Sequence, residues 1–448
     1  MESVSAARFW TRWLEGETIS ADTMGRVHVA LNITRLRDGL HNVYSRLAGD
    51  RSCRQPPFLR TIIDYLTAST AASVPRSTVP WYVWCSVAAV TSAMIGVHWD
   101  ISWHRSIGRD TFWTPAHLAI HLCGVLAGVA CGYLILATTF GHDSFLRNAS
   151  VRIWGFRGPL GAFIAAWGGI AMLTSAPFDN WWHDAYGLDV KILSPPHMVL
   201  AAGIFAVNLG ALILILGYMN RASAAERGRY LAMFLYVGGM VLVTLLVLEM
   251  ELTSRVVMHS VYFYRVVATV TPLVLAGVAR ASRYKWASTV VAGVYMIFVL
   301  LMSWILPLFP AEPKLGPVLY PTMQFTPPEF PLLLIVPAFA LDLLWERTAR
   351  WGLWKQSVIS AAVFLLVFAA VQWPFADFLM SSAARNWFFG TRYFGYNTNP
   401  LGIYAQYRFM PPAAPADSLR EAALAFTISA LLIRVGLGYG ERLGRIRR

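Results

Sequence analysis

Two stretches of the chain carry the same arrangement of acidic and histidine residues. The first runs from Asp100 to His117 and the second from Asp179 to His197. Each begins with Asp-x3-His, has Trp directly before that His, places Gly and Asp four and six residues after it, and ends in Pro-x-His. Imidazoles and carboxylates together suit copper or non-haem iron. The shared spacing therefore predicts two similar metal sites.

The spacing also predicts how each site is built. An Asp and a His four residues apart project from one face of a helix. The chain then turns through a loop that contains glycine and re-enters a helix, where proline is tolerated in the first turn. The final His of each stretch then lies opposite the Asp/His pair. The predicted ligands are Asp100, His104, His117, Asp179, His183 and His197.

Several neighbouring residues are further candidates. His121 shares a helix face with His117 and joins the first set of ligands, and a third group of ionisable residues follows at a later outer turn. Ionisable residues near membrane spans are costly and are therefore functional candidates. This third, secondary group of metal candidates is Glu249, Glu251 and His259. The residues expected to orient the ligands rather than bind the metal are Trp103, Trp182, Asp110 and Asp189.

The composition sets these residues in a membrane protein. Of 448 residues, 56% are hydrophobic and 14% are charged, whereas soluble domains have about 45–50% and about 25%. The net charge of +13 comes mainly from arginines in short loops between apolar runs. That distribution is typical of membrane topology and argues against a nucleic-acid partner.

The apolar runs predict an all-α, polytopic integral membrane bundle of about ten transmembrane helices, since a span takes about 20 residues. The expected spans are residues 81–99, 115–140, 158–177, 197–219, 229–251, 259–280, 286–309, 329–346, 356–375 and 419–440. Alternate connections are rich in arginine, which puts both termini in the cytoplasm and the metal sites toward the outer face. We expect a bacterial inner (plasma) membrane with the sites on the periplasmic side.

The chain divides into three predicted parts. Residues 1–80 form a cytoplasmic N-terminal extension, and 81–280 form a membrane region with the duplicated metal-site hairpins. Residues 281–448 add further helices and a long aromatic outer loop at 376–418, interpreted as an interfacial lid. Agreement at so many positions indicates an internal two-helix repeat.

The spacing Asp100-x3-His104-x12-His117 resembles that of the Asp-His-His copper ligands in a membrane-embedded subunit of the copper membrane monooxygenases, the particulate methane and ammonia monooxygenases. The string DNWWH…PPH, from Asp179 to His197, is similar to the DNWGH…PLH pattern of the same subunit in the ammonia enzyme. The resemblance covers roughly residues 81–220, and this chain is far longer than that subunit. It implies copper sites in the membrane toward its outer face.

These observations predict a copper-binding subunit of a monooxygenase-like oxidoreductase, with iron as the alternative metal. Its partners would be the bilayer, other membrane subunits and a small apolar substrate or a quinol. The two units could form two mononuclear sites or one dinuclear site, and no catalytic residue can be named. The alternatives are a multi-pass transporter or metal-handling protein, or a non-catalytic subunit of a membrane complex. An Asp/His pair can also be a salt link between helices.

Overall fold

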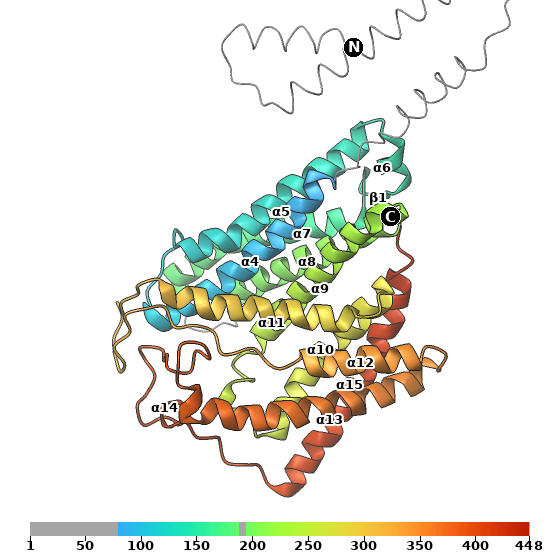
Figure 1. Cartoon of the computed structure of the whole chain (residues 1–448). Coiled ribbons are helices and arrows are strands. Elements are labelled where there is room, and N and C mark those ends of the chain that lie inside the picture. Colours follow the sequence, from blue (N-terminus) through green and yellow to red (C-terminus); the bar gives the residue numbers. More distant parts are fainter. Residues whose placement is uncertain (1–78, 188–193, 448) are drawn as a thin grey trace, which may run out of the picture. The chain divides into compact units, whose positions relative to one another are not determined.

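A computed structural model describes residues 79–187 and 194–447, which form a bundle of long helices (Figure 1). In this described part, the only strands are the short hairpin of β1 (Val151–Ile153) and β2 (Phe156–Gly158). The predicted all-α polytopic fold is confirmed. Nine helices of the described residues are long and apolar enough to cross a membrane: α4 (Trp81–Ser106), α5 (Pro115–Phe140), α7 (Leu160–Tyr186), α8 (Pro195–Met219), α9 (Ala224–Leu248), α10 (Val261–Ser282), α11 (Ala287–Ile305), α13 (Leu353–Met380) and α15 (Pro415–Leu443).

The first four long helices make two hairpins that pack side by side. Helix α4 packs on α5, α7 packs on α8, and α5 joins the two hairpins by packing on α7. Small residues allow the close approach of α7 and α8: a Cβ atom at Gly168 would lie 2.7 Å from the carbonyl oxygen of Gly203, and one at Gly210 would lie 2.5 Å from the Ala165 nitrogen. Such small residues are typical of helix contacts in membranes.

Helices α4 and α7 run further than the apolar runs predict. Helix α4 continues past residue 99 to Ser106, and α7 continues past Pro177 to Tyr186. Both Asp-x3-His pairs therefore lie in the last turns of a long helix. At the same end of the bundle, α5 and α8 begin with Pro115 and Pro195 in their first turn.

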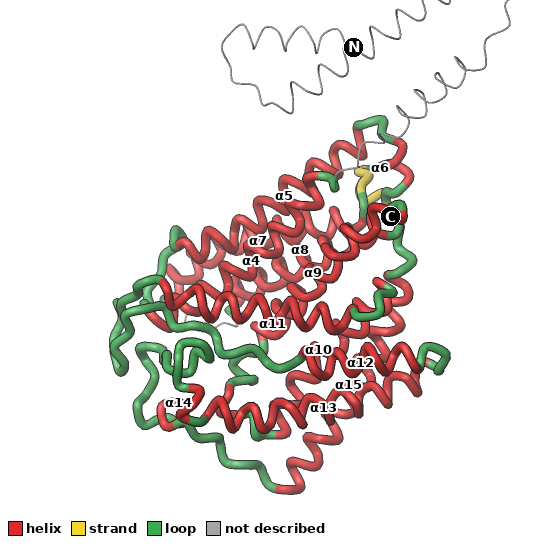
Figure 2. The backbone as a smooth tube through the Cα atoms, in the orientation of Figure 1, coloured by secondary structure: helices red, strands yellow, loops and turns green. Residues whose placement is uncertain are grey.

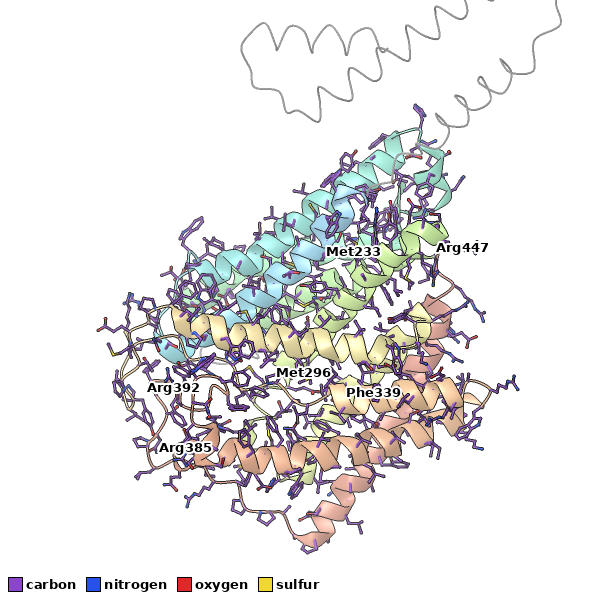
Figure 3. The ribbon with its side chains drawn as sticks, viewed as in Figure 1. Met233, Met296, Phe339, Arg385, Arg392 and Arg447 are labelled. Atoms are coloured by element: carbon purple, nitrogen blue, oxygen red, sulfur yellow. The ribbon has the colours of Figure 1, made fainter. Side chains whose placement is uncertain are left out.

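The described chain begins and ends at one end of the bundle. The hydroxyl groups of Tyr82 and Tyr218 are hydrogen-bonded at 2.7 Å, and the side-chain amide of Asn220 donates to the Ile446 carbonyl at 2.8 Å. The longest loops gather at the other end (Figure 2). Figure 3 shows Arg447 at the first end and Arg385 at the loop-bearing end. Because both ends of the described chain lie at the same end of the bundle, the described residues must cross it an even number of times.

The predicted span at 329–346 is wrong as a complete helix. Helix α12 (Ile335–Arg347) has 13 residues, about 20 Å of helix, whereas the hydrocarbon core is about 30 Å thick. Before it, prolines that lack an amide hydrogen keep the chain irregular. Nearby side chains bond this segment: Leu332 N donates to the Tyr295 hydroxyl at 3.2 Å, and Leu333 N to Gln372 Oε1 at 3.0 Å. Half of this crossing is thus irregular backbone buried in protein.

The aromatic loop lies against the end of α4. Helix α13 ends at Met380, and the loop to α15 contains the four-residue helix α14 (Ile403–Gln406). The Tyr396 amide donates to the carbonyl of Arg105 at 2.9 Å, and the Tyr396 carbonyl accepts from Leu319 N at 2.7 Å. The loop is therefore bonded to the helix that carries the first Asp/His pair. Nearly all of the predicted extension at 1–80 falls outside the described residues.

Candidate metal centre

The first cluster consists of Asp100 and His104 at the end of α4, Asp110 in the following loop and His117 at the start of α5. The Nε2 atom of His117 lies 3.1 Å from Asp100 Oδ1 and 3.3 Å from Asp110 Oδ2. The Nε2 atom of His104 lies 3.3 Å from Asp110 Oδ2 and 3.9 Å from Asp100 Oδ2. Two imidazoles therefore face two carboxylates across one small space.

The second cluster consists of Asp179 and His183 near the end of α7 and His197 in the first turn of α8. The Nε2 atom of His183 lies 3.4 Å from Asp179 Oδ2, and that of His197 lies 3.5 Å from Asp179 Oδ1. Each oxygen of the carboxylate thus faces one imidazole, as in the first cluster. The structure brings all six predicted primary ligands into these two groups; Asp189 falls outside the described residues.

One imidazole in each cluster already uses its other nitrogen. The Nδ1 atom of His117 lies 3.1 Å from the Thr111 carbonyl oxygen, and that of His183 lies 3.3 Å from the Gly187 carbonyl oxygen. A carbonyl oxygen only accepts, so Nδ1 carries the hydrogen in both rings. In a neutral ring the Nε2 lone pair then points at a carboxylate, which is another acceptor. Only a proton or a metal cation between them makes that contact favourable.

The aspartate oxygens indicate the same need. Asp100 Oδ1 and Asp179 Oδ1 are buried and have no hydrogen-bond donor among the described residues, although each lies within 3.5 Å of a histidine nitrogen. A buried acceptor without a donor costs about 1–3 kcal/mol, and more when it is charged. The equivalent oxygen atoms of both clusters therefore need a positive partner, either a proton on the facing imidazole or a bound cation.

Several nitrogen–oxygen pairs in the two clusters have about the spacing of two donors on one metal ion. Two donors that each lie about 2.1 Å from an ion are roughly 3.0–3.4 Å apart at angles between square and tetrahedral geometry. The contacts of Asp110 and His117 in the first cluster measure 3.1 and 3.3 Å, and those in the second measure 3.4 and 3.5 Å, whereas His104 lies 3.9 Å from Asp100 and would have to move closer. The backbone bonds at Nδ1 are also those that orient metal-bound histidines.

Asp110 is placed differently from the sequence-based expectation. We expected it to support the ligands from behind, but its Oδ2 atom points into the first cluster, and Asp100, His104 and Asp110 form a set that could hold a metal ion. Burial would raise the pKa of the Asp110 carboxyl, but hydrogen bonding to His104 and the charge of the surrounding histidines lower it below its usual value. An Asp stands six residues after the first histidine in both stretches, and this repetition could have indicated that Asp110 belongs to the cluster.

The two tryptophans brace the helix ends behind the ligands. Trp103 Nε1 donates to the Arg109 carbonyl at 2.8 Å, which holds the loop that delivers Asp110. The ring of Trp182 packs on Tyr186, with ring centres 4.5 Å apart. Both contacts agree with an orienting role.

The two clusters lie close to each other. Helix α5, which carries His117, packs against α7, which carries Asp179, and the charge of His183 acts on Asp110. His121 lies one turn after His117, and the charges of His117 and Asp179 both act on it. Its buried Nδ1 has no hydrogen-bond partner among the described residues. His121 is therefore positioned beside both clusters.

The third candidate group does not converge. Glu249 accepts a hydrogen bond from the Thr269 hydroxyl at 2.5 Å, and Glu251 lines a separate cavity. His259 pairs with Asp377 at 3.3 Å and lies between aromatic rings. The structure gives these three residues three different environments, so they form no common metal site.

Comparisons with protein-family models, with curated proteins and with solved structures found no match to this chain. Its function is therefore inferred from the geometry of the two clusters and from the membrane setting.

Proposed function

We propose that this chain is a membrane metalloprotein that binds one redox metal ion in each cluster. The observation that carries the proposal is the half-buried carboxylate of Asp100 and of Asp179, whose two oxygens each face a histidine Nε2 atom. In His117 and His183 the other nitrogen already donates to a carbonyl. A metal ion would satisfy nitrogen and oxygen lone pairs together.

Copper is the metal we propose, with iron as the alternative. Imidazole nitrogen suits both metals, and the carboxylates supply anionic oxygen donors. Asp100, His104, Asp110 and His117 would hold the first ion, and Asp179, His183 and His197 the second. Because the two clusters lie close together, a dinuclear arrangement would use the same residues.

The function we infer is that of a subunit in a monooxygenase-like membrane oxidoreductase. A bound copper or iron ion would supply electron transfer and dioxygen activation. The chain itself would fix the ligands through backbone bonds at Nδ1 and cover the end of α4 with the aromatic loop. The resemblance of the Asp-His-His spacing supports this function, and a small apolar substrate or a quinol would reach the site through the lipid. Partner subunits would complete such an enzyme.

We further propose that the clusters face the periplasm of a bacterial inner membrane, with both termini in the cytoplasm. The connections at the end opposite the clusters carry most of the arginines, and this end of a bundle faces the cytoplasm under the positive-inside rule.

An internal duplication would account for the two hairpins. Gly108 and Gly187 stand at the same position after the first histidine and have φ angles of +86° and +87°, a conformation that glycine adopts most readily. The equal turn in both loops supports a common origin.

Elemental analysis and electron paramagnetic resonance of the full-length protein, purified in detergent, test this proposal. We expect one or two equivalents of copper in the wild type and loss of part of it in His104→Ala and in His183→Ala. His142→Ala is the matched control, because His142 is a histidine of the loop after α5, away from both clusters. Copper content unchanged in both cluster variants, or no stoichiometric metal in freshly isolated protein, would overturn the metal assignment.

A transporter or metal-handling protein is a second candidate, and one observation favours it. The eighth crossing combines the short helix α12 with irregular backbone, and such broken helices line substrate sites in many transporters. Uptake of copper into proteoliposomes that contain only this chain would support transport over oxidation.

A further inference from the structure

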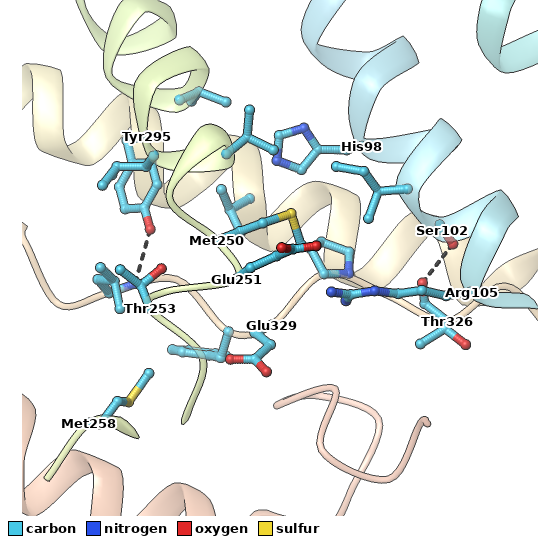
Figure 4. A pocket seen from close by; sticks show the side chains of 18 of the residues that line it. His98, Ser102, Arg105, Met250, Glu251, Thr253, Met258, Tyr295, Thr326 and Glu329 are labelled. Carbon is cyan, nitrogen blue, oxygen red and sulfur yellow. Dashed lines mark hydrogen bonds between the residues drawn. The ribbon is translucent and has the colours of Figure 1, made fainter. Parts of the chain in front are cut away.

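A cavity of about 330 Å³ lies beside α4 (Figure 4). From α4 it is lined by His98, Ile101, Ser102 and Arg105, which are spaced three and four residues apart and so share one helix face. Asp100 and His104 do not line it. The cavity and the first cluster thus use two faces of one helix.

Three charged side chains from distant parts of the sequence meet at this cavity. Arg105 comes from α4, Glu251 from the turn after α9, and Glu329 from the irregular segment before α12. Figure 4 shows them on the same side of the cavity, across from His98 and Tyr295. A cavity with charges of both signs at one side is suited to a ligand that itself carries both charges.

The opposite charges do not neutralise one another. Among the described residues, the Arg105 guanidinium makes no ion pair, and no ion pair joins it to Glu251 or Glu329. One oxygen of Glu329 accepts from the backbone nitrogen of Arg255 at 2.9 Å. Arg105 and Glu329 are half-buried and Glu251 is exposed, and a partly buried charge is stabilised by an opposite partner. Space between unpaired opposite charges therefore favours a dipolar ligand.

The rest of the lining combines polar side chains (His98, Ser102, Thr253, Tyr295, Thr326 and Tyr404) with an apolar wall. Helix α9 supplies Val243, Leu246 and Val247, α11 supplies Val299, and Phe330 comes from the irregular segment. The volume is at the lower end for small-molecule sites, which measure about 300–1,000 Å³. The cavity therefore accepts a compact polar group with an apolar extension.

We propose that this cavity binds a zwitterionic amphiphile. Its anionic group pairs with Arg105, its ammonium group lies against Glu251 and Glu329, and its apolar part packs against the valines of α9 and α11. The ligand is either the headgroup of a membrane phospholipid or a free zwitterion with the same two charges. This inference does not depend on the proposed metal function.

Native mass spectrometry of the full-length protein, with phosphatidylethanolamine and phosphatidylglycerol added in equal amounts, tests the proposal. We expect the zwitterionic lipid to be retained in preference to the anionic one. Arg105→Gln and Glu251→Gln should each weaken retention about tenfold, the effect of losing one well-placed charge contact. Arg109→Gln is the matched control, since Arg109 is an exposed arginine four residues along that does not line the cavity.

A second arm separates the two sources. Free O-phosphoethanolamine is titrated calorimetrically into delipidated protein: binding that is lost in Arg105→Gln assigns the site to a free zwitterion, and lipid retention alone assigns it to a headgroup. Retention of both lipids to the same extent, unchanged in both variants, overturns the proposal. So does preference for the anionic lipid that depends on Arg105 but not on Glu251. Metal content is measured in every variant, and it should not change.

Discussion

The two clusters share one plan, and within the described residues only the first contains a second carboxylate. In both, an aspartate at the end of a long helix faces two histidines, one on its own helix and one on the next. The first cluster adds Asp110, whose Oδ2 atom lies 3.3 Å from both His104 and His117. The described residues contain no counterpart in the second cluster, where Asp189 falls outside them.

This difference bears on how each cluster would hold a metal. If Asp189 does not join the second cluster, the first would be the more anionic of the two, and its additional oxygen donor would favour iron or an oxidised copper ion. The same helical plan can therefore tune two ions differently, and substitutions matched between the clusters test whether it does.

The largest expected effect comes from the shared aspartates. Asp100→Asn and Asp179→Asn each keep the shape of the side chain but remove the charge that faces two histidines. We expect metal affinity of the altered cluster to fall by more than about a hundredfold, since even residues that only support a ligand are worth about 10–100-fold. Titration against a competing chelator measures it. Asp184→Asn, at an exposed aspartate of the last turn of α7, is the control and should retain full affinity.

Asp110→Asn and Asp189→Asn test the difference itself. We expect Asp110→Asn to weaken metal binding in the first cluster about 10–100-fold, because Asp110 contacts both histidines of that cluster. Equal loss in Asp189→Asn would mean that the second cluster also has two carboxylates and that the clusters are equivalent. Unchanged metal affinity in Asp110→Asn would mean that Asp110 only supports the ligands, as its position in the loop suggested.

The sequence predicted which aspartates and histidines converge in the two clusters because helix geometry is regular. An Asp and a His four apart in a helix must share a face, and Pro at the start of the next helix fixes where the second His returns. It did not predict that Asp110 enters the cluster, because the path of the loop depends on contacts with distant residues. Tyr396, almost three hundred residues later, lies directly against Gly108.

Two other predictions failed for a related reason. The third candidate group, Glu249, Glu251 and His259, is close in sequence. Each side chain contacts a different neighbour, so the three do not meet at one site. The run at 329–346 is apolar enough for a span, but a hydropathy average does not include the helix hydrogen bonds that are lost at proline. The side chains of Tyr295 and Gln372, which compensate the irregular backbone, come from other helices.

The loop glycines should distinguish the two hairpins by stability. Gly108 and Gly187 both have positive φ angles, so alanine at either position is strained by about 1–3 kcal/mol. At Gly108 a Cβ atom would collide with the Tyr396 hydroxyl, whereas at Gly187 it would meet none of the described residues within 4 Å. Thermal unfolding in detergent should therefore show a larger loss for Gly108→Ala. A larger loss for Gly187→Ala would contradict this difference between the two loops.

The smallest expected effect comes from the tryptophans before the first histidines. Trp103→Phe removes the hydrogen bond from Nε1 to the Arg109 carbonyl, worth about 1 kcal/mol, and loosens the loop that carries Asp110. Trp182→Phe keeps an aromatic ring against Tyr186 and should change less. Electron paramagnetic resonance of metal-loaded protein should therefore show a broader or shifted signal for the first cluster only. The same change in both variants would mean that Trp103 acts through ring packing, as Trp182 does, and that the loop bond does not set the position of Asp110.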